Sequence, residues 1–286
     1  MRRIRWDRML LLATSTALCI FGIVCLIGYG VDWLGSRQTA RELNALYEHG
    51  PEEPRQVEVA APQLSVDFSA AVQVLPSDQE TDLSPFPYPC NPMLAADERF
   101  DAARQKNPDI IGWLSVGGLL REPVVQRDNV YYVTHDAQGK RNNNGAIFLD
   151  ANADLSTRPY TLILYGHNMK SGAMFGCLRN YEYADFCKRH PILTFNTLYE
   201  EGRYAIFAVS KISDRVIDEN YVDLFKLSTS MKTAERQSAI DSLEANSMLR
   251  FQVDVRPDDQ LLLMVTCTDR EAERRVVAAR RLRESE

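Results

Sequence analysis

The fold follows from an apolar run that ends in a cysteine: Leu261-Leu262-Leu263-Met264-Val265-Thr266-Cys267. A continuous apolar run of this length predicts a buried strand, and the cysteine falls where that strand leaves the sheet. Eight positions further on, Arg275 opens a second strand-like run that extends to Leu282. We therefore expect a hairpin with Cys267 and Arg275 at its neck, within side-chain reach of each other.

A third strand-like run, Thr161–Tyr165, leads through Gly166 to His167. A glycine permits a tight exit from the sheet, so the imidazole is presented at a strand end, where it can act as a general acid or base. A thiol near a cation and an imidazole is suited to acyl transfer through a thiolate. From the residues alone, a loop histidine with a structural hydrogen bond and a solvated strand-end arginine remain alternatives.

The rest of the second half of the chain predicts a mainly β fold with peripheral helices. Eight candidate strands separated by turn residues favour a closed or nearly closed barrel. They are Ile110–Val116, Pro123–Gln126, Val130–Thr134, Gly145–Leu149, Thr161–Tyr165, Tyr204–Ile212, Leu261–Thr266 and Arg275–Leu282. Helices are expected at Leu94–Lys106, Gly172–Arg179, Tyr183–Arg189 and Thr233–Asn246.

The N-terminus predicts a membrane anchor. Residues 9–31 are free of charge and rich in Leu, Ile, Val and Phe, and such a run is long enough to cross a bilayer as a helix. Four arginines precede it, so residues 1–8 are expected in the cytoplasm and the rest of the chain outside, as a single-pass protein of the cell membrane. A cleaved signal peptide is the alternative, but its apolar region is normally shorter.

Between the anchor and the barrel, residues 32–92 predict a short helix and a linker. The helix is expected at Ser36–Tyr47, and residues 51–92 hold eight of the 13 prolines. Such a composition favours an extended stalk. Residues 93–286 are then expected to form the catalytic domain outside the cell.

Composition argues against several classes of protein and site. A net charge of -6 gives no reason to expect nucleic-acid binding. The six cysteines form no disulfide framework, and neither they nor the histidines have the spacing of zinc ligands. The chain also lacks a G-x-S-x-G motif and a dinucleotide fingerprint. We expect no cofactor and no metal.

Taken together, these segments resemble the sortases, and specifically their class B. The run Leu263–Cys267 is similar to the sortase signature T-L-x-T-C, with Thr266-Cys267 kept and Leu263-Met264 in place of Thr-Leu. The segment Tyr165–Lys170 resembles the class B histidine segment. Similar motifs occur in the same order at Ile111–Leu114, Pro123–Gln126, Asp128–Tyr132, Gly145–Asp150 and Arg275–Arg280, so the resemblance covers roughly residues 94–283.

The resemblance implies a closed eight-stranded sortase-type β-barrel and a cysteine transpeptidase at a Gram-positive cell surface. By position, Cys267 is implied as nucleophile, His167 as general acid/base and Arg275 as the cation that positions substrate and stabilises the oxyanion. Asp269 matches an acidic residue of some class B members and could orient His167, although a turn-capping role is the alternative.

The implied partners are the membrane, secreted proteins with a C-terminal sorting motif cleaved at a threonine carbonyl, and a peptidoglycan precursor amine as acceptor. Two other functions stay open at this point. One is a pilin-polymerising sortase that uses a protein lysine as acceptor. The other is a non-catalytic domain that binds the cell surface.

Overall fold

Eight strands form a closed barrel, as the sequence predicts. The computed structural model describes residues 6–48, 91, 93–270, 272–283 and 286. The strands are β1 (Ile110–Val116), β2 (Leu120–Val125), β3 (Ile147–Leu149), β4 (Thr161–Tyr165), β5 (Ile192–Thr197), β6 (Arg203–Ser213), β7 (Leu261–Cys267) and β8 (Glu273–Arg281). Around the barrel their order is β1-β2-β3-β4-β7-β8-β6-β5. The pairs β2–β3 and β4–β7 are parallel and the others are antiparallel.

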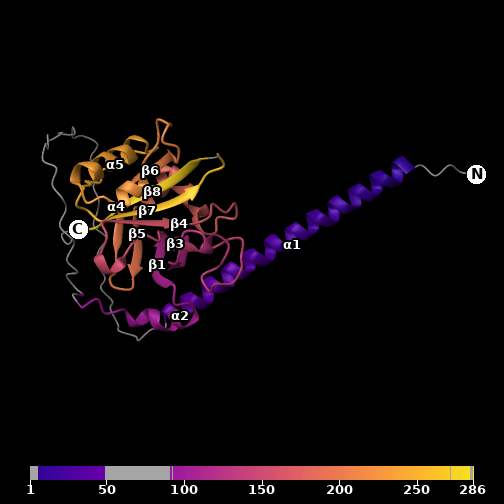
Figure 1. The fold of residues 1–286 in the computed structure, drawn as a ribbon, viewed down its shortest axis with the longest axis horizontal. Helices are drawn as coiled ribbons and strands as arrows, with labels where there is room; N and C mark the ends of the chain where they lie inside the picture. The colour runs from indigo at the N-terminus through magenta and orange to yellow at the C-terminus, as the bar shows by residue number, and fades with distance from the viewer. Residues whose placement is uncertain (1–5, 49–90, 92, 271, 284–285) are drawn as a thin grey trace, which may run out of the picture.

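The helices are peripheral, again as predicted (Figure 1). They are α1 (Trp6–Glu48), α2 (Asp101–Lys106), α3 (Ala184–Arg189), α4 (Leu224–Thr229) and α5 (Thr233–Ala245), with 3-10 turns η1 (Glu98–Phe100), η2 (Tyr131–Val133), η3 (Leu155–Thr157) and η4 (Phe175–Glu182). The long apolar strand β7 divides two cores. Leu262 and Met264 belong to the larger one, whereas Leu261 and Leu263 join Ile240 of α5 in the other. Side chains alternate between the faces of a strand, so a strand buried on both faces reads as one apolar run.

Two expectations about individual strands are wrong. The segment Val130–Thr134 contains the 3-10 turn η2 instead of a strand, because Asp128 Oδ1 accepts hydrogen bonds from the backbone amides of Val130 and Tyr131 at 2.8 and 2.6 Å. Strand β5 was not predicted. Its pattern, with every second residue buried, is nevertheless the alternation typical of a half-buried strand.

Helix α1 is one uninterrupted helix, so the expected short helix Ser36–Tyr47 is its C-terminal part. Ser36 does not cap a new helix, because its Oγ donates to the carbonyl of Asp32 one turn earlier, at 3.0 Å. The predicted linker at residues 51–92 lies, apart from Asn91, outside the described residues.

The C-terminal half of α1 docks along the barrel through apolar and polar contacts. The rings of Tyr47 and Trp113 stack with centroids 4.4 Å apart, and Trp113 Nε1 donates to Asn44 Oδ1 at 2.6 Å. Towards the middle of the helix, Asn142 Nδ2 donates to the carbonyl of Asp32 at 3.0 Å. These satisfied contacts at both ends of the docked half fix the direction of α1 relative to the barrel.

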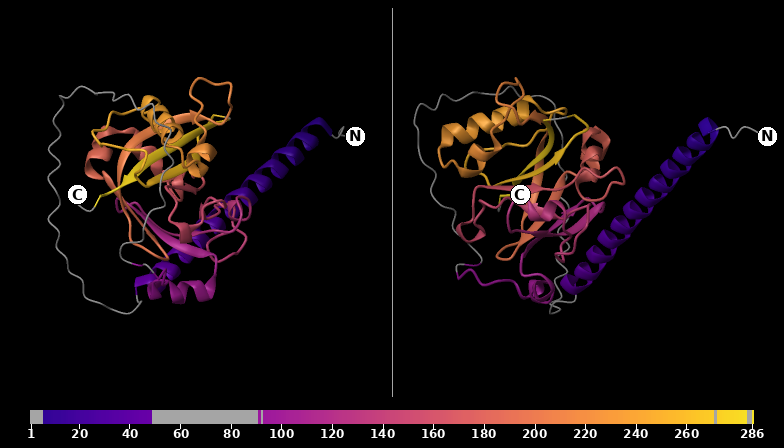
Figure 2. Two further views of the ribbon diagram at one scale, coloured as in Figure 1. Left: turned by 60° about the vertical axis from the view of Figure 1, so that its left-hand side comes forward. Right: turned by 45° about the vertical axis from the view of Figure 1, so that its right-hand side comes forward.

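The N-terminal half of α1 points away from the barrel (Figures 1 and 2). Its apolar side chains from Leu18 onwards are exposed. Leu18, Phe21 and Leu26 are 70, 67 and 71% exposed. By length and composition, this helix is long and apolar enough to cross a membrane. A surface of this kind on an otherwise polar protein is unfavourable in water, so the helix is a candidate transmembrane segment.

Candidate active site

The histidine and the cysteine singled out in the sequence lie at the ends of neighbouring parallel strands. β4 and β7 pair with a constant offset, from Thr161 opposite Leu261 to Tyr165 opposite Val265. The pairing continues past β4, because Thr266 Oγ1 donates to the carbonyl of Gly166 at 2.7 Å. His167 and Cys267 each follow the last paired residues, Tyr165 and Val265, by two positions. Two apolar strands thus deliver an imidazole and a thiol to the same edge of the barrel.

Cys267 is the last residue of β7 and is exposed. The other described cysteines of the barrel domain, Cys177 and Cys187, are buried. Burial raises the pKa of the Cys177 thiol to about 12 and that of Cys187 to about 11. A thiol with such a pKa has almost no thiolate at neutral pH, so these two cysteines behave as small core residues.

Two arginines lie across the hairpin from the cysteine. β8 pairs with β7 so that Arg274 faces Cys267 and Arg275 faces Thr266. The expected neck of the hairpin is therefore present, with Arg274 in direct register with the thiol and Arg275 one residue further along β8. Successive residues of a strand point to opposite faces, so the two guanidinium groups leave the hairpin on different sides.

The surroundings of the two arginines differ. Arg274 is partly exposed and its Nη2 lies 2.5 Å from Asp214 Oδ2 on the surface. Arg275 is 7% exposed, and its Nε and Nη2 both donate to Glu182 Oε1 at 2.8 and 2.5 Å. Arg275 Nη1 is buried without a hydrogen-bond partner among the described residues. A buried donor without a partner costs stability, which distinguishes Arg275 from Arg274, whose guanidinium is paired at the surface.

The imidazole of His167 is held by the backbone. Its Nε2 lies 2.8 Å from the carbonyl oxygen of Val133. A carbonyl only accepts hydrogen bonds, so Nε2 carries a proton, and Nδ1 is the nitrogen that gains or loses one. Gly145 packs against the same ring, since a Cβ added there would lie 3.1 Å from His167 Cδ2. The contact to Val133 spans 34 residues of sequence and was not predicted.

Asp269 lies exposed in the turn between β7 and β8. In the part of the chain that the structure describes, no hydrogen bond or ion pair joins it to His167. Glu182, which accepts two hydrogen bonds from Arg275, was not singled out in the sequence. Its signal was weak, because an acidic residue at the end of a helical segment is usually solvated.

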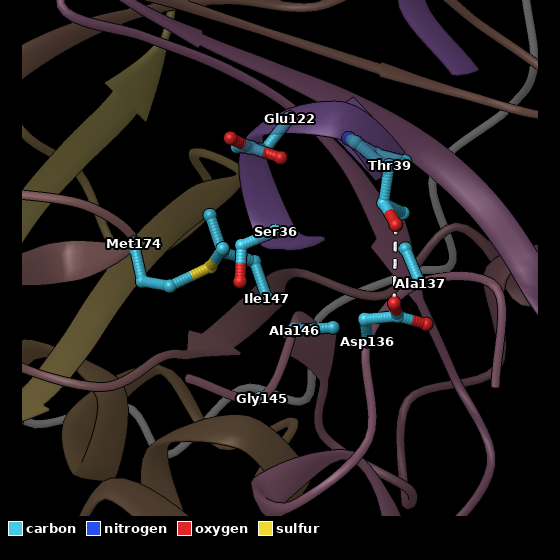
Figure 3. Close-up of a pocket in the computed structure, with 10 residues that line it drawn as sticks. Ser36, Thr39, Glu122, Asp136, Ala137, Gly145, Ala146, Ile147 and Met174 are labelled. Atoms are coloured by element: carbon cyan, nitrogen blue, oxygen red, sulfur yellow. Dashed lines mark hydrogen bonds between the residues drawn. The ribbon is translucent and has the colours of Figure 1, made fainter. Parts of the chain in front are cut away.

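A small cavity lies between α1 and the barrel (Figure 3). Its volume is about 10 Å³, enough for no more than one water molecule. Ser36 and Thr39 of α1 line it together with Glu122 of β2 and Met174. Burial raises the pKa of Glu122 to about 8, because its carboxyl group has no compensating charge there. The cavity is too small for a peptide, so it is not a substrate site.

Within the described ranges, no three side chains of His, Cys, Asp or Glu gather where they could hold a metal ion. The groups available at the barrel edge are a thiol, an imidazole and two guanidinium groups, with one buried donor free. This set can perform nucleophilic attack on a carbonyl, proton transfer and stabilisation of an oxyanion.

Known proteins share this architecture. A family model described as a sortase domain matches residues 123–282, more than half of the chain. Sortase B of Staphylococcus aureus is 27% identical over 173 residues, which cover 60% of this chain and 68% of that protein.

Solved structures give the same picture. A Bacillus anthracis protein described as similar to sortase B has a TM-score of 0.66 at 24% identity, covering 87% of this chain and 97% of its own, and supports the fold. A Staphylococcus aureus sortase B–substrate complex has a TM-score of 0.59 at 25% identity and covers 66% of this chain and 87% of its own.

Proposed function

This chain belongs to the sortase family, as a class B cysteine transpeptidase, and from that premise we propose its reaction, its catalytic residues and its place in the cell. It cleaves a C-terminal sorting motif of secreted proteins at a threonine carbonyl and transfers the acyl group to an amine of a cell-wall precursor. The single observation that carries this proposal is the parallel register of β4 and β7, from which we infer that His167 lies near Cys267.

In the first half of the reaction, the Cys267 thiolate bonds to the carbonyl carbon of the threonine. The peptide C–N bond breaks, and protonated His167 gives its Nδ1 proton to the leaving amine. A thioester and neutral His167 remain. In the second half, the acceptor amine attacks the thioester and the C–S bond breaks. His167 takes the proton of that amine, so thiolate and imidazolium are both restored.

Arg275 stabilises the charge that develops on the carbonyl oxygen in both halves. Its guanidinium is held in one orientation by Glu182 before substrate binds, and donors contribute most when they need no reorganisation. Arg274 is less suited, because its guanidinium is partly exposed and paired with Asp214. The substrate class is supported by the similar Staphylococcus aureus protein, which has been solved with a substrate.

The apolar half of α1 anchors the enzyme in the membrane. The arginines before residue 9 place the N-terminus in the cytoplasm, so the barrel lies on the outer face. A sorting substrate and a precursor amine that both occur at this surface are then met within a thin layer, which raises their effective concentration.

The test is to incubate the full-length protein with peptides containing a Pro-x-Thr segment and with a short glycine peptide as acceptor. Mass spectrometry should show an acyl adduct on Cys267 and a product in which the acceptor amine replaces the residues after threonine. Cys267→Ala should give neither species. Cleavage that depends on a protein lysine as acceptor would favour pilin polymerisation. If the wild type cleaves none of the peptides, the proposed reaction is wrong.

A further inference from the structure

The guanidinium of Arg275 is held in one orientation by a single carboxylate. Glu182 Oε1 accepts from both Nε and Nη2 of Arg275, so the edge of the guanidinium that carries these two nitrogens is occupied. Arg275 is 7% exposed, and Nη1 has no partner among the described residues. A planar guanidinium has its donors at fixed angles, so fixing one edge also fixes the direction of the remaining nitrogen.

Glu182 is in turn held by a second cation. Lys211 of β6 pairs directly with Arg275 of β8, and its Nζ lies 3.2 Å from Glu182 Oε2. Two cations opposite each other on neighbouring strands repel, and the carboxylate between them removes that repulsion. Burial alone would raise the pKa of Glu182, but hydrogen bonds from Arg275 and Lys211 outweigh it and hold this pKa below its usual range. Glu182 is therefore ionised at neutral pH.

Glu182 also connects Arg275 to the segment that follows His167. It is the last residue of η4, whose Arg179 donates from Nη2 to the carbonyl of Met169 at 2.7 Å and from Nε to the carbonyl of Gly176 at 2.8 Å. The chain between His167 and Glu182 is thus tied down at its own turn and, through Glu182, to β8. One carboxylate links the imidazole segment to the guanidinium.

We propose that Glu182 is a positioning residue, which fixes the orientation of the Arg275 guanidinium for its role toward the carbonyl oxygen of the substrate. The inference rests on the proposed role of Arg275. Glu182 touches neither the substrate nor the thiol and acts through the arginine. Without it, Arg275 would rotate among several rotamers and lose much of the preorganisation that makes an oxyanion donor effective.

The barrel offers a matched control at its other end. Glu200 lies between two arginines, 3.1 Å from Arg158 Nε and 2.8 Å from Arg281 Nη1, and its side chain is 14% exposed, against 25% for Glu182. Glu200→Ala removes an ion cluster of the same kind from a place where we assign no chemistry. Any effect that Glu182→Ala shares with Glu200→Ala is therefore structural.

The experiment is a double-mutant cycle on the full-length enzyme, with kcat and KM for peptide cleavage and the thermal midpoint measured for each variant. Glu182→Ala should lower kcat about ten- to a hundredfold with little change in KM. Once Arg275→Ala is present, adding Glu182→Ala should cost no further activity. Glu200→Ala should lower the thermal midpoint and leave kcat near the wild-type value. Glu182→Gln, which keeps an acceptor for Arg275, should retain more activity than Glu182→Ala.

Two results would overturn the inference while leaving the proposed reaction intact. One is a normal kcat in Glu182→Ala when Arg275→Ala is strongly impaired. The other is an equal loss from Glu182→Ala with and without Arg275, which would mark a general structural role. A normal kcat in Arg275→Ala would instead contradict the proposed role of the arginine, and the role of Glu182 with it.

Discussion

The two ends of the barrel are built from similar parts and differ in one respect. Each end has a glutamate between two cations, Glu182 with Arg275 and Lys211 at one, and Glu200 with Arg158 and Arg281 at the other. At the Glu200 end, the polar network continues through Gln260, whose Oε1 accepts from Arg281 and whose Nε2 donates to the carbonyl of Pro159.

At the Glu182 end, the network of hydrogen bonds is incomplete. Only two buried side-chain polar atoms of the described residues lack a partner, and one of them is Arg275 Nη1. The other is Asn196 Oδ1, beside the docked part of α1. A fully satisfied cluster stabilises the fold, whereas a buried donor without a partner costs stability and is tolerated where it has another role. We therefore expect substitutions at the Glu182 end to change mainly the catalytic rate, and substitutions at the Glu200 end to change mainly the stability.

The largest effect should come from the exposed thiol at the Glu182 end. Cys267→Ala removes the nucleophile, so turnover of a sorting peptide should fall at least about 10⁴-fold while the thermal midpoint stays unchanged. Cys187→Ala, at a buried thiol whose pKa is raised, should keep most of the activity. Steady-state cleavage assays measure both. A Cys267→Ala enzyme that still forms an acyl adduct would refute the assignment of the nucleophile.

At the far end, the largest effect should be on stability alone. Arg236 of α5 is fully buried and donates to Pro257, Thr161, Leu227, Tyr160 and Asp259, joining α5 to the starts of β4 and β7. Arg236→Met removes all of these hydrogen bonds, although the carbonyls of Leu227 and Tyr160 keep another donor, and should cost about 2–4 kcal/mol of unfolding free energy. Denaturant titration gives the free energy, and kcat below the new midpoint should remain that of the wild type. A large fall in kcat would contradict the prediction that this end of the barrel contributes to stability alone.

A smaller effect should separate the two arginines of the hairpin. Arg275→Lys keeps the charge but not the planar fork, so kcat should fall about ten- to a hundredfold. Arg274→Lys should change kcat less than about threefold, because an ion pair at the surface contributes little. The two variants differ by one position on β8, so the pair controls for charge. The opposite ranking would make Arg274, the residue in register with Cys267, the functional cation.

The smallest effect should come from neither end but from Glu122 beneath α1. The folded protein holds this carboxyl protonated up to a pKa of about 8, whereas the ordinary value is 4.5. The unfolded chain therefore binds fewer protons between these values, and stability is lost as the pH rises from about 4.5 to about 8. Glu122→Gln should raise the thermal midpoint above pH 8 by a few degrees and have little effect near pH 4. Calorimetry across this range measures the difference, and parallel curves for the two proteins would contradict it.

Much of the catalytic end could be predicted from the sequence because its signals are local. β4, β7 and β8 contain apolar runs near the candidate residues: Cys267 ends β7, His167 follows β4 by two positions, and Arg275 is the third residue of β8. The sequence motifs also predicted the closed barrel. What remained hidden was the pairing between strands, because the parallel register of β4 and β7 joins residues 100 positions apart. The register decides that Arg274, and not Arg275, lies opposite Cys267.

The residues that were missed act through distant contacts. Glu182 meets Arg275 across 93 residues, and Val133 meets His167 across 34, so nothing in their neighbourhoods marked them. The error at Val130–Thr134 has a different cause. Val130-Tyr131-Tyr132-Val133 has strong β propensity, but the carboxylate of Asp128 captures two amides of the segment and closes a turn.

The unbroken course of α1 has a mechanical consequence. If residues 9–31 lie in a bilayer, α1 connects the barrel rigidly to its membrane segment. The loop that binds Asp32 through Asn142 also contains Gly145, which packs on His167. A helix advances about 1.5 Å and turns about 100° per residue. One residue inserted after Val31 would rotate the barrel, with the edge that carries Cys267, by about 100° around the axis of α1. Seven inserted residues would nearly restore the original orientation of the barrel and move it about 10 Å along the axis of α1. The orientation and height of Cys267 relative to such a bilayer would thus depend on the number of residues in α1.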